Sequence, residues 1–153
     1  MEKTKQNFGF GLLETIITLA IITLAAAILM SAFGSFRAAS DLTETHSNII
    51  GIIKDARART LASNSNSNYG VHFATDRSVL FKGNSYSSSD PNNDVYLLPA
   101  STEISAINLT GGAVDTVFTR LNGTTTTSGT ISIRSKRNSS TRIITLEPTG
   151  VVK

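Results

Sequence analysis

The sequence predicts an α+β protein in which one long N-terminal helix precedes a small antiparallel β-sheet. The chain has 153 residues, and an apolar run of 24 residues from Phe10 to Phe33 contains a single charged side chain. Residues 35–62 contain no proline and repeat apolar side chains at helical spacing. After Tyr69, short segments rich in valine, isoleucine and threonine alternate with glycine, asparagine and serine, which is typical of strands and turns.

The apolar run is long enough to cross a membrane. A helix of that length spans about 36 Å, whereas the hydrocarbon core of a bilayer is roughly 30 Å thick. Thr15, Thr18 and Thr23 interrupt the run only mildly, because a helical threonine hydroxyl can donate to a carbonyl one turn earlier. Lys3 and Lys5 precede the run, so we expect the leader to stay in the cytoplasm and the rest to be exported.

Two simpler interpretations of this run are a secretory signal peptide and a plain membrane anchor. A signal peptide has a shorter apolar core that ends at small residues. Residues 25–27 are three alanines, but the apolar stretch continues beyond them through Met30. A plain anchor leaves Glu14 unexplained, because a carboxylate inside a bilayer is costly unless it finds a partner. Glu14 is therefore the first candidate functional residue.

The residues that begin the run resemble a known processing signal. Residues 9–14 read Gly-Phe-Gly-Leu-Leu-Glu, which resembles the class III signal of type IV pilins and type II secretion pseudopilins. This resemblance implies cleavage between Gly9 and Phe10 by the membrane-embedded prepilin peptidase, followed by N-methylation of Phe10. The processed chain would have 144 residues, with Glu14 at its fifth position. The sequence departs from the family at Gly11, where threonine or serine is usual.

Glu14 has a physical role in that interpretation. Inside a packed filament its carboxylate can pair with the new cationic amine of Phe10 on a neighbouring subunit. Opposite charges at contact distance in a medium of low dielectric constant attract strongly, so the pair can fix the axial register between helices. We therefore expect Glu14 to act in assembly.

The resemblance also implies a domain organisation and a location. The expected pieces are a cleaved leader at 1–9, a membrane or filament-core helix at 10–34, an amphipathic helix at 35–63 and a β-rich head at 64–153, arranged as a pilin-like lollipop. The protein is expected to cross the inner (cytoplasmic) membrane once, with its N-terminus in the cytoplasm and its head outside, and to join a filament after assembly. The expected partners are other pilin or pseudopilin subunits, prepilin peptidase, the inner-membrane assembly platform and membrane lipid.

The amphipathic helix is expected to lay one apolar stripe on the head. A run of serine and asparagine at 63–68 is expected to end it, since these residues favour turns over helix interiors. The apolar residues expected to form the stripe are Phe36, Ala39, Leu42, Ile49, Ile50, Ile52, Ile53, Ala56 and Leu61.

The head is expected to be one small domain whose strands form an antiparallel sheet against this helix. Polar loops at 85–94 and 124–129 separate the strands. The expected strands are Tyr69–Ala74, Ser78–Phe81, Val95–Leu98, Glu103–Leu109, Val114–Thr119, Thr130–Arg134, Arg142–Leu146 and a weak terminal strand at Val151–Val152.

The C-terminal part of the head carries a second resemblance. Its features are a strand ending in phenylalanine at 117–118, Asn-Gly at 122–123, a hairpin of 130–133 and 142–146, and a glycine followed by valines at 150–152. This pattern is similar to the GspH/FimT-like family, which contains the minor pseudopilin H subunit of type II secretion and related minor pilins of type IV pili. The resemblance implies a minor structural subunit.

A basic hairpin offers an alternative function. Residues 131–153 carry a net charge of +4, and Arg134, Lys136, Arg137 and Arg142 cluster around one predicted turn. Such a cluster can contact DNA phosphates, so the alternative is a competence-type minor pilin that binds extracellular DNA. No aromatic side chain interleaves with the cluster to stack on bases, and a solvated hairpin is the simpler interpretation.

Nothing in the sequence indicates catalysis, a cofactor or a metal site. The chain has no cysteine, and neither His46 nor His72 has a carboxylate at ligand spacing beside it. No serine lies in a Gly-x-Ser-x-Gly motif. Four aspartates of the head lack the alternating spacing of a calcium loop; they are Asp76, Asp90, Asp94 and Asp115. We therefore expect a structural filament subunit and not an enzyme.

Overall fold

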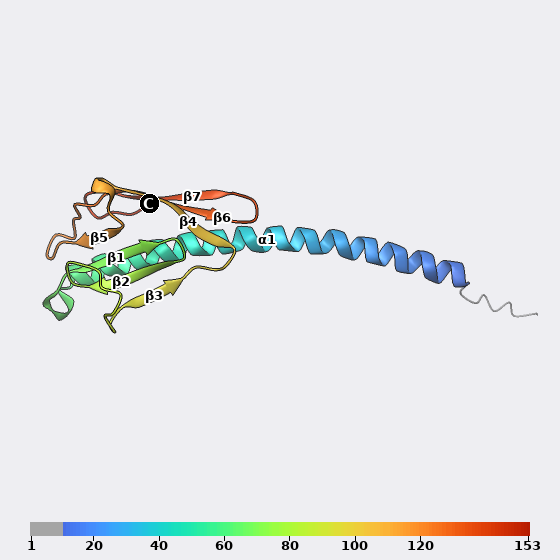
Figure 1. The fold of residues 1–153 in the computed structure, drawn as a ribbon, viewed down its shortest axis with the longest axis horizontal. Coiled ribbons are helices and arrows are strands. Elements are labelled where there is room, and N and C mark those ends of the chain that lie inside the picture. Colours follow the sequence, from blue (N-terminus) through green and yellow to red (C-terminus); the bar gives the residue numbers. More distant parts are fainter. Residues whose placement is uncertain (1–10) are drawn as a thin grey trace, which may run out of the picture. The chain divides into compact units, whose positions relative to one another are not determined.

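The computed structural model describes residues 11–153, so Gly9 and Phe10 lie outside the described part of the chain. An α+β fold is confirmed, because one long helix, α1 (Leu12–Leu61), is followed in these residues by seven strands paired antiparallel (Figure 1). The chain divides into two compact units, and the division falls inside α1, between Phe36 and Arg37. The helix therefore contributes to both units.

The first unit consists, within the described residues, of the N-terminal half of α1. Its apolar side chains are exposed, by 62% for Ile22 and 74% for Phe33. The hydroxyls of Thr15 and Thr18 donate to the carbonyls of Leu12 and Thr15 at 2.8 and 3.0 Å, as helical threonines commonly do. By length and composition, α1 is the one helix among residues 11–153 that is able to cross a membrane.

The second unit contains two antiparallel sheets, whereas the sequence analysis predicted one. The first sheet has the strand order β3-β2-β1-β5 and the second has the order β4-β6-β7. The predicted terminal strand at 151–152 is a single bridge between Leu146 and Val152. The strands and the two 3₁₀ turns are β1 (Tyr69–Ala74), β2 (Arg77–Lys82), β3 (Asp94–Leu97), β4 (Thr102–Leu109), β5 (Asp115–Phe118), β6 (Gly129–Ser135), β7 (Thr141–Leu146), η1 (Asn64–Asn66) and η2 (Thr110–Gly112).

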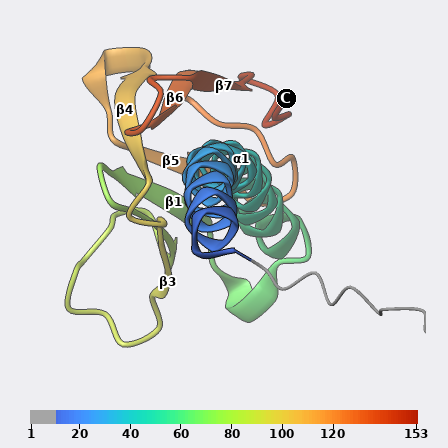
Figure 2. The same ribbon diagram turned by 90° about the vertical axis from the view of Figure 1, so that its right-hand side faces the viewer.

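The helical segment 37–61 packs against both sheets. Figures 1 and 2 show β6 and β7 on one side of this segment and β1 on another. Ile53 of the helix is fully buried in the same apolar core as Phe73 and Phe118 of the first sheet and Ile131 of the second. One sheet covers a single stripe of a helix, so two sheets bury more of the apolar surface of this segment.

The buried stripe of α1 differs from the predicted stripe at both ends. Phe36, Ala39 and Leu61 were expected to pack on the head, but all three are exposed, by 72% for Phe36. Thr45 and Thr60 are fully buried although the apolar pattern did not include them. The buried residues recur every three or four positions, as the period of a helix requires. They are Ala38, Leu42, Thr45, Ile49, Ile53, Ala56 and Thr60.

Hydrogen bonds explain the two buried threonines. The Thr60 hydroxyl donates to the carbonyl of Ala56 at 2.8 Å and accepts from the backbone amide of Tyr69 at 3.0 Å. The Thr45 hydroxyl lies 3.3 Å from the hydroxyl of Thr102 on β4. A buried hydroxyl costs little when it is hydrogen-bonded. These partners come from the head, so the apolar period of the helix alone gave no sign of them.

The serine–asparagine run ends the helix, as predicted for residues 63–68. Ser63, Ser65 and Asn66 have φ angles of 49°, 51° and 54°. This left-handed conformation is incompatible with a continuing right-handed helix. The chain then turns back into β1 alongside the helix that it has just left.

Arg57 on α1 holds two turns of the head together. Its Nε donates to the carbonyl of Gly123 at 3.0 Å and its Nη2 donates to the carbonyl of Thr149 at 3.2 Å. Gly150 follows with φ +77°, and a Cβ at this position would lie 2.0 Å from the carbonyl oxygen of Gly123. The C-terminal turn therefore needs both the arginine and the glycine to stay in place.

Candidate functional site

The predicted processing site is only partly within the described residues. Gly9 and Phe10 lie outside them, so cleavage and methylation stay predictions. Glu14 lies in the first turn of α1, where a carboxylate is favourable next to the positive end of the helix dipole. Its side chain is exposed and has no ion-pair partner within residues 11–153.

The predicted basic cluster lies on the hairpin of β6 and β7, and its arginines occupy both faces. Opposite residues of an antiparallel pair project to the same face of a sheet. Arg142 is opposite Ile133, which is buried, so Arg142 is on the face that covers the helix. Arg134 is opposite Thr141 and therefore on the outer face. The structure does not place the four predicted cations on one surface.

The partners of the two arginines differ in charge. On the outer face, the Arg134 guanidinium forms an ion pair with Glu103, the residue opposite it on β4. On the inner face, the Arg142 guanidinium donates to the hydroxyl of Thr43 on α1 at 3.3 Å. The charge of Arg134 is thus locally compensated, whereas the only described partner of Arg142 is neutral.

The two cations in the turn of this hairpin are exposed. Neither the Lys136 nor the Arg137 side chain has a hydrogen-bond or ion-pair partner among the residues described. The backbone amide of Lys136 donates to the carbonyl of Ser101 at 2.8 Å, which fixes the base of the turn. The pKa of Asp76 is below its ordinary value, chiefly because Arg77 donates a hydrogen bond to it; the charge of Lys136 adds a weaker contribution.

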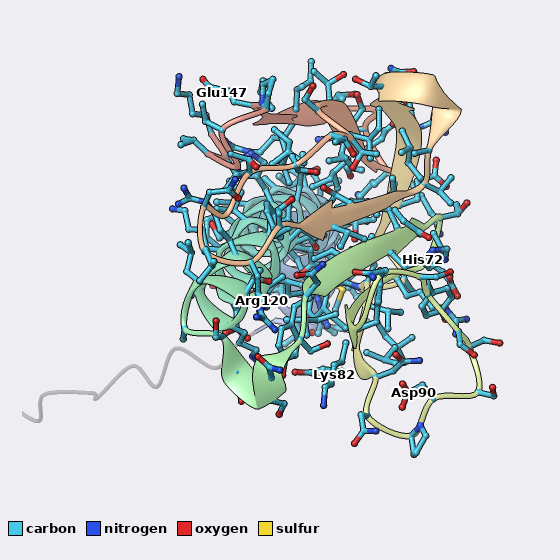
Figure 3. The ribbon with its side chains drawn as sticks, turned by 90° about the vertical axis from the view of Figure 1, so that its left-hand side faces the viewer. His72, Lys82, Asp90, Arg120 and Glu147 are labelled. Atoms are coloured by element: carbon cyan, nitrogen blue, oxygen red, sulfur yellow. The ribbon has the colours of Figure 1, made fainter. Side chains whose placement is uncertain are left out.

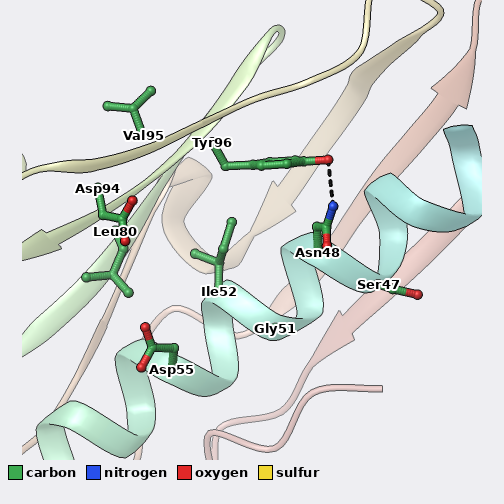
Figure 4. A pocket seen from close by; sticks show the side chains of 9 residues that line it. All are labelled: Ser47, Asn48, Gly51, Ile52, Asp55, Leu80, Asp94, Val95 and Tyr96. Atoms are coloured by element: carbon green, nitrogen blue, oxygen red, sulfur yellow. Dashed lines mark hydrogen bonds between the residues drawn. The ribbon is translucent and has the colours of Figure 1, made fainter.

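A groove that the sequence gave no sign of lies between α1 and β3 (Figure 4). It has a volume of about 410 Å³ and carries Asp55 on the helix side and Asp94 on the strand side. At its other end, the Asn48 amide donates to the Tyr96 hydroxyl at 3.0 Å. Asp55 is already ion-paired with Arg59 at 2.7 Å, and this hydrogen-bonded pair raises the pKa of Arg59.

The fold gives His72 an acidic partner that the sequence did not place beside it. Figure 3 labels His72, which lies on β1. Its Nδ1 lies 2.5 Å from a carboxylate oxygen of Asp115 on the adjacent strand β5. The ring also stacks on Tyr86, with centroids 4.0 Å apart and planes 8° from parallel. No group of three or more potential metal ligands exists among residues 11–153. The stacking of Tyr86 on His72 connects the loop that carries Tyr86 to the sheet.

Comparisons of the chain with known protein families, curated proteins and solved structures find no match. What the fold defines is an α+β protein with one apolar N-terminal helix that is long enough to span a membrane. The candidate functional features are Glu14 on that helix, the basic hairpin and the groove beside β3.

Proposed function

We propose that the protein is a minor pilin or pseudopilin, a structural subunit of a type II secretion pseudopilus or a type IV pilus. In this proposal prepilin peptidase cleaves between Gly9 and Phe10, Phe10 becomes N-methylated, and the processed chain assembles through its apolar helix. The proposal assigns the protein no enzymatic activity. Its partners are other subunits of the filament, the peptidase and the assembly platform of the inner membrane.

The observation that carries the proposal is the exposed apolar helix around one carboxylate. Leu12, Ile22 and Phe33 are spread along the first unit, and each exposes well over half of its surface. A helix that is apolar on all sides needs either lipid or other apolar helices around it. A filament subunit is surrounded first by lipid, while it is in the membrane, and then by other apolar helices, when it packs into the filament core.

Glu14 makes the filament energetically more favourable than the membrane for this helix. In the bilayer an isolated carboxylate is costly. Next to the Phe10 amine of a neighbouring subunit the same charge is compensated, and the contact is satisfied at only one axial position. Glu14 therefore selects the register of subunits as they pass from membrane to filament.

The head fits the outer part of such a subunit. Residues 37–61 of α1 attach it directly to the apolar segment, and its own core gives it an independent fold. We place the head outside the inner membrane and the leader in the cytoplasm.

Replacement of Glu14 tests this function. We expect Glu14→Leu to abolish incorporation into filaments while the chain still inserts into the membrane, measured by fractionation and by crosslinking to neighbouring subunits. Thr18→Leu is the matched control, since it also replaces a polar side chain of the same helix with leucine. The Thr18 hydroxyl donates a hydrogen bond to the carbonyl of Thr15 on that helix. Normal assembly of Glu14→Leu would refute the role of the carboxylate. If neither Glu14→Leu nor Thr18→Leu assembled, the defect would come from the increased hydrophobicity of the helix and not from loss of the carboxylate.

A further inference from the structure

The second unit carries cations at the end where the apolar segment joins it. Arg37 is its first residue and is exposed on α1. The turn between β6 and β7 reaches the same end of this unit, beside the beginning of its helical segment (Figure 1). We call Arg37, Lys136, Arg137 and Arg142 the basic end.

Contacts fix the hairpin to this part of the helix. Besides the hydrogen bond from Arg142 to Thr43, a shallow groove is lined by both elements. Thr43 follows Arg37 by six residues, which is about 9 Å of helix. The hairpin turn therefore lies close to the beginning of the helical segment of this unit. The residues that line the groove are Ala39, Leu42, Thr43, Asn138, Ser140, Thr141 and Arg142.

The charges at this end do not cancel. The nearby Arg134 and Arg77 are ion-paired with Glu103 and Asp76, so those four groups contribute little net charge. Two further acids lie on the same turns of the helix. They are Asp41, which accepts a hydrogen bond from Ser101 at 2.6 Å, and Glu44. The four cations of the basic end outnumber these two acids.

We propose that the basic end binds the phosphate groups of anionic phospholipids and thereby holds the head against the membrane before assembly. This inference rests on the proposal that the apolar segment lies in a bilayer. Each lysine or arginine close to an anionic surface strengthens binding about fivefold, and the effect decays over roughly 8 Å at physiological salt. The cations next to the point of attachment are therefore the ones that this inference assigns to the contact.

Lipid suits this patch better than DNA does. Arg134, one of the cations of the DNA hypothesis, is neutralised by Glu103 on the outer face of the sheet. Of the remaining cations, Arg37 begins the helical segment of the head, and Arg142 contacts Thr43 one to two turns later. If the apolar segment lies in a bilayer, the chain at Arg37 emerges from an extended array of phosphates. The basic end also contains no aromatic side chain for stacking on bases.

A label in the hairpin turn tests the inference on the full chain. The protein has no cysteine, so Ser139→Cys gives a single attachment site for a fluorophore in the turn. Ser88→Cys gives a matched site in the exposed loop between β2 and β3. The chain is reconstituted in vesicles of phosphatidylcholine with or without phosphatidylglycerol, and a quencher is attached to lipid headgroups. We expect phosphatidylglycerol to increase quenching at position 139 but not at position 88, and high salt to reverse the increase.

Charge-neutralising variants identify the residues. The triple variant Lys136→Gln, Arg137→Gln and Arg142→Gln should weaken the docking equilibrium by roughly 100-fold, from about fivefold for each cation. The control is a second triple variant that loses the same charge elsewhere on the head and should keep the quenching. Its substitutions are Lys54→Gln, Lys82→Gln and Lys153→Gln.

Several results would overturn the inference. The inference is contradicted if quenching at position 139 is the same with and without phosphatidylglycerol. It is also contradicted if the two triple variants lose quenching to the same extent. Retention of duplex DNA by vesicles of phosphatidylcholine, lost only in the hairpin variant, would assign the patch to DNA. Failure of the chain to float with either kind of vesicle would refute the membrane-anchored function as well, whereas flotation without lipid-dependent quenching refutes only the lipid contact.

Discussion

The two halves of α1 show how one helix is built for two surroundings. In the half before Arg37, Ile22 is 62% exposed, whereas Ile53 in the half after it is fully buried by the head. The threonines differ in the same way. Thr18 satisfies its hydroxyl on its own helix, while the Thr60 hydroxyl also accepts a hydrogen bond from Tyr69 of β1.

The two halves therefore differ in whether their apolar side chains are buried by other residues of the chain. The half after Arg37 has its apolar and polar partners in the two sheets, so the head stands as a folded unit. In the half before it, the hydroxyls of Thr15 and Thr18 bond to the helix backbone, and the apolar side chains are exposed. The predictions below test this division.

The largest expected effect is the contrast between two equivalent isoleucine truncations. Ile53→Ala removes a fully buried side chain and should lower the free energy of unfolding of the head by about 2–5 kcal/mol. Ile22→Ala should leave that free energy unchanged, because the side chain belongs to the first unit and is largely exposed. Urea unfolding of the detergent-solubilised chain, followed by tyrosine fluorescence, measures both. Equal losses for the two variants would break the division between the halves.

Two glycines sharpen the contrast between a packed and an open site. A Cβ on Gly70 of β1 would lie 2.5 Å from the carbonyl oxygen of Thr116 and 2.6 Å from the Phe81 ring. Gly70→Ala should therefore destabilise the head by about 1–3 kcal/mol. Gly51 lies in α1 with no atom near an added Cβ, so Gly51→Ala should stabilise the helix by about 0.5–1 kcal/mol. Thermal unfolding of the pair should give shifts of opposite sign, and shifts of the same sign would contradict the packing at Gly70.

A smaller loss is expected when the helix no longer holds the C-terminal turn. Arg57→Met keeps the aliphatic stem but removes the hydrogen bonds to Gly123 and Thr149, which should cost about 1–2 kcal/mol. Arg59→Met is the control, because its ion pair with Asp55 is partly exposed to solvent and should contribute about 0–1 kcal/mol. Hydrogen exchange of the amides at 149–153 should increase in the first variant only. Unchanged exchange in Arg57→Met would show that the turn does not depend on the arginine.

The smallest expected effect is on how the Tm of the head depends on pH in acid. The Lys153 ammonium donates to Glu147 and holds the pKa of that carboxyl below its ordinary value of about 4.3. A depressed pKa in the folded state adds stability above the pKa of the unfolded chain, and this stability is lost as the pH falls through the folded value. Lys153→Gln should therefore lower Tm slightly near neutral pH and leave Tm unchanged at a pH where Glu147 is protonated, so that the loss in Tm on acidification becomes smaller. An acid profile identical to that of the wild type would show that the pair is inactive in solution.

The sequence predicted elements whose signals are local. The serine–asparagine run at 63–68 marked the end of α1, and segments rich in isoleucine and threonine marked strands such as β6 and β7 to within one residue. The division into two sheets was missed because it depends on pairing over long separations. For example, β5 returns beside β1 and brings Asp115 to His72.

The same reasoning explains the candidate sites. Glu14 and the cations of the hairpin were found because charge stands out in an apolar or a turn-forming segment. The neutralisation of Arg134 was missed, since Glu103 lies on another strand, and so was the contact of Arg142 with Thr43. The groove beside β3 was missed because it forms only when β3 lies next to α1. Arg37 was missed because it becomes part of a basic surface only when the β6–β7 turn lies at the same end of the head.

The most direct measurement of the proposed function is the mass and N-terminal sequence of the protein from cells with active prepilin peptidase. We expect a polypeptide of 144 residues that begins at Phe10 and carries one methyl group on its α-amine. This result would supply the cation that Glu14 needs on a neighbouring subunit. Retention of Met1 in that protein would contradict the account, because no such amine would then exist beside the carboxylate.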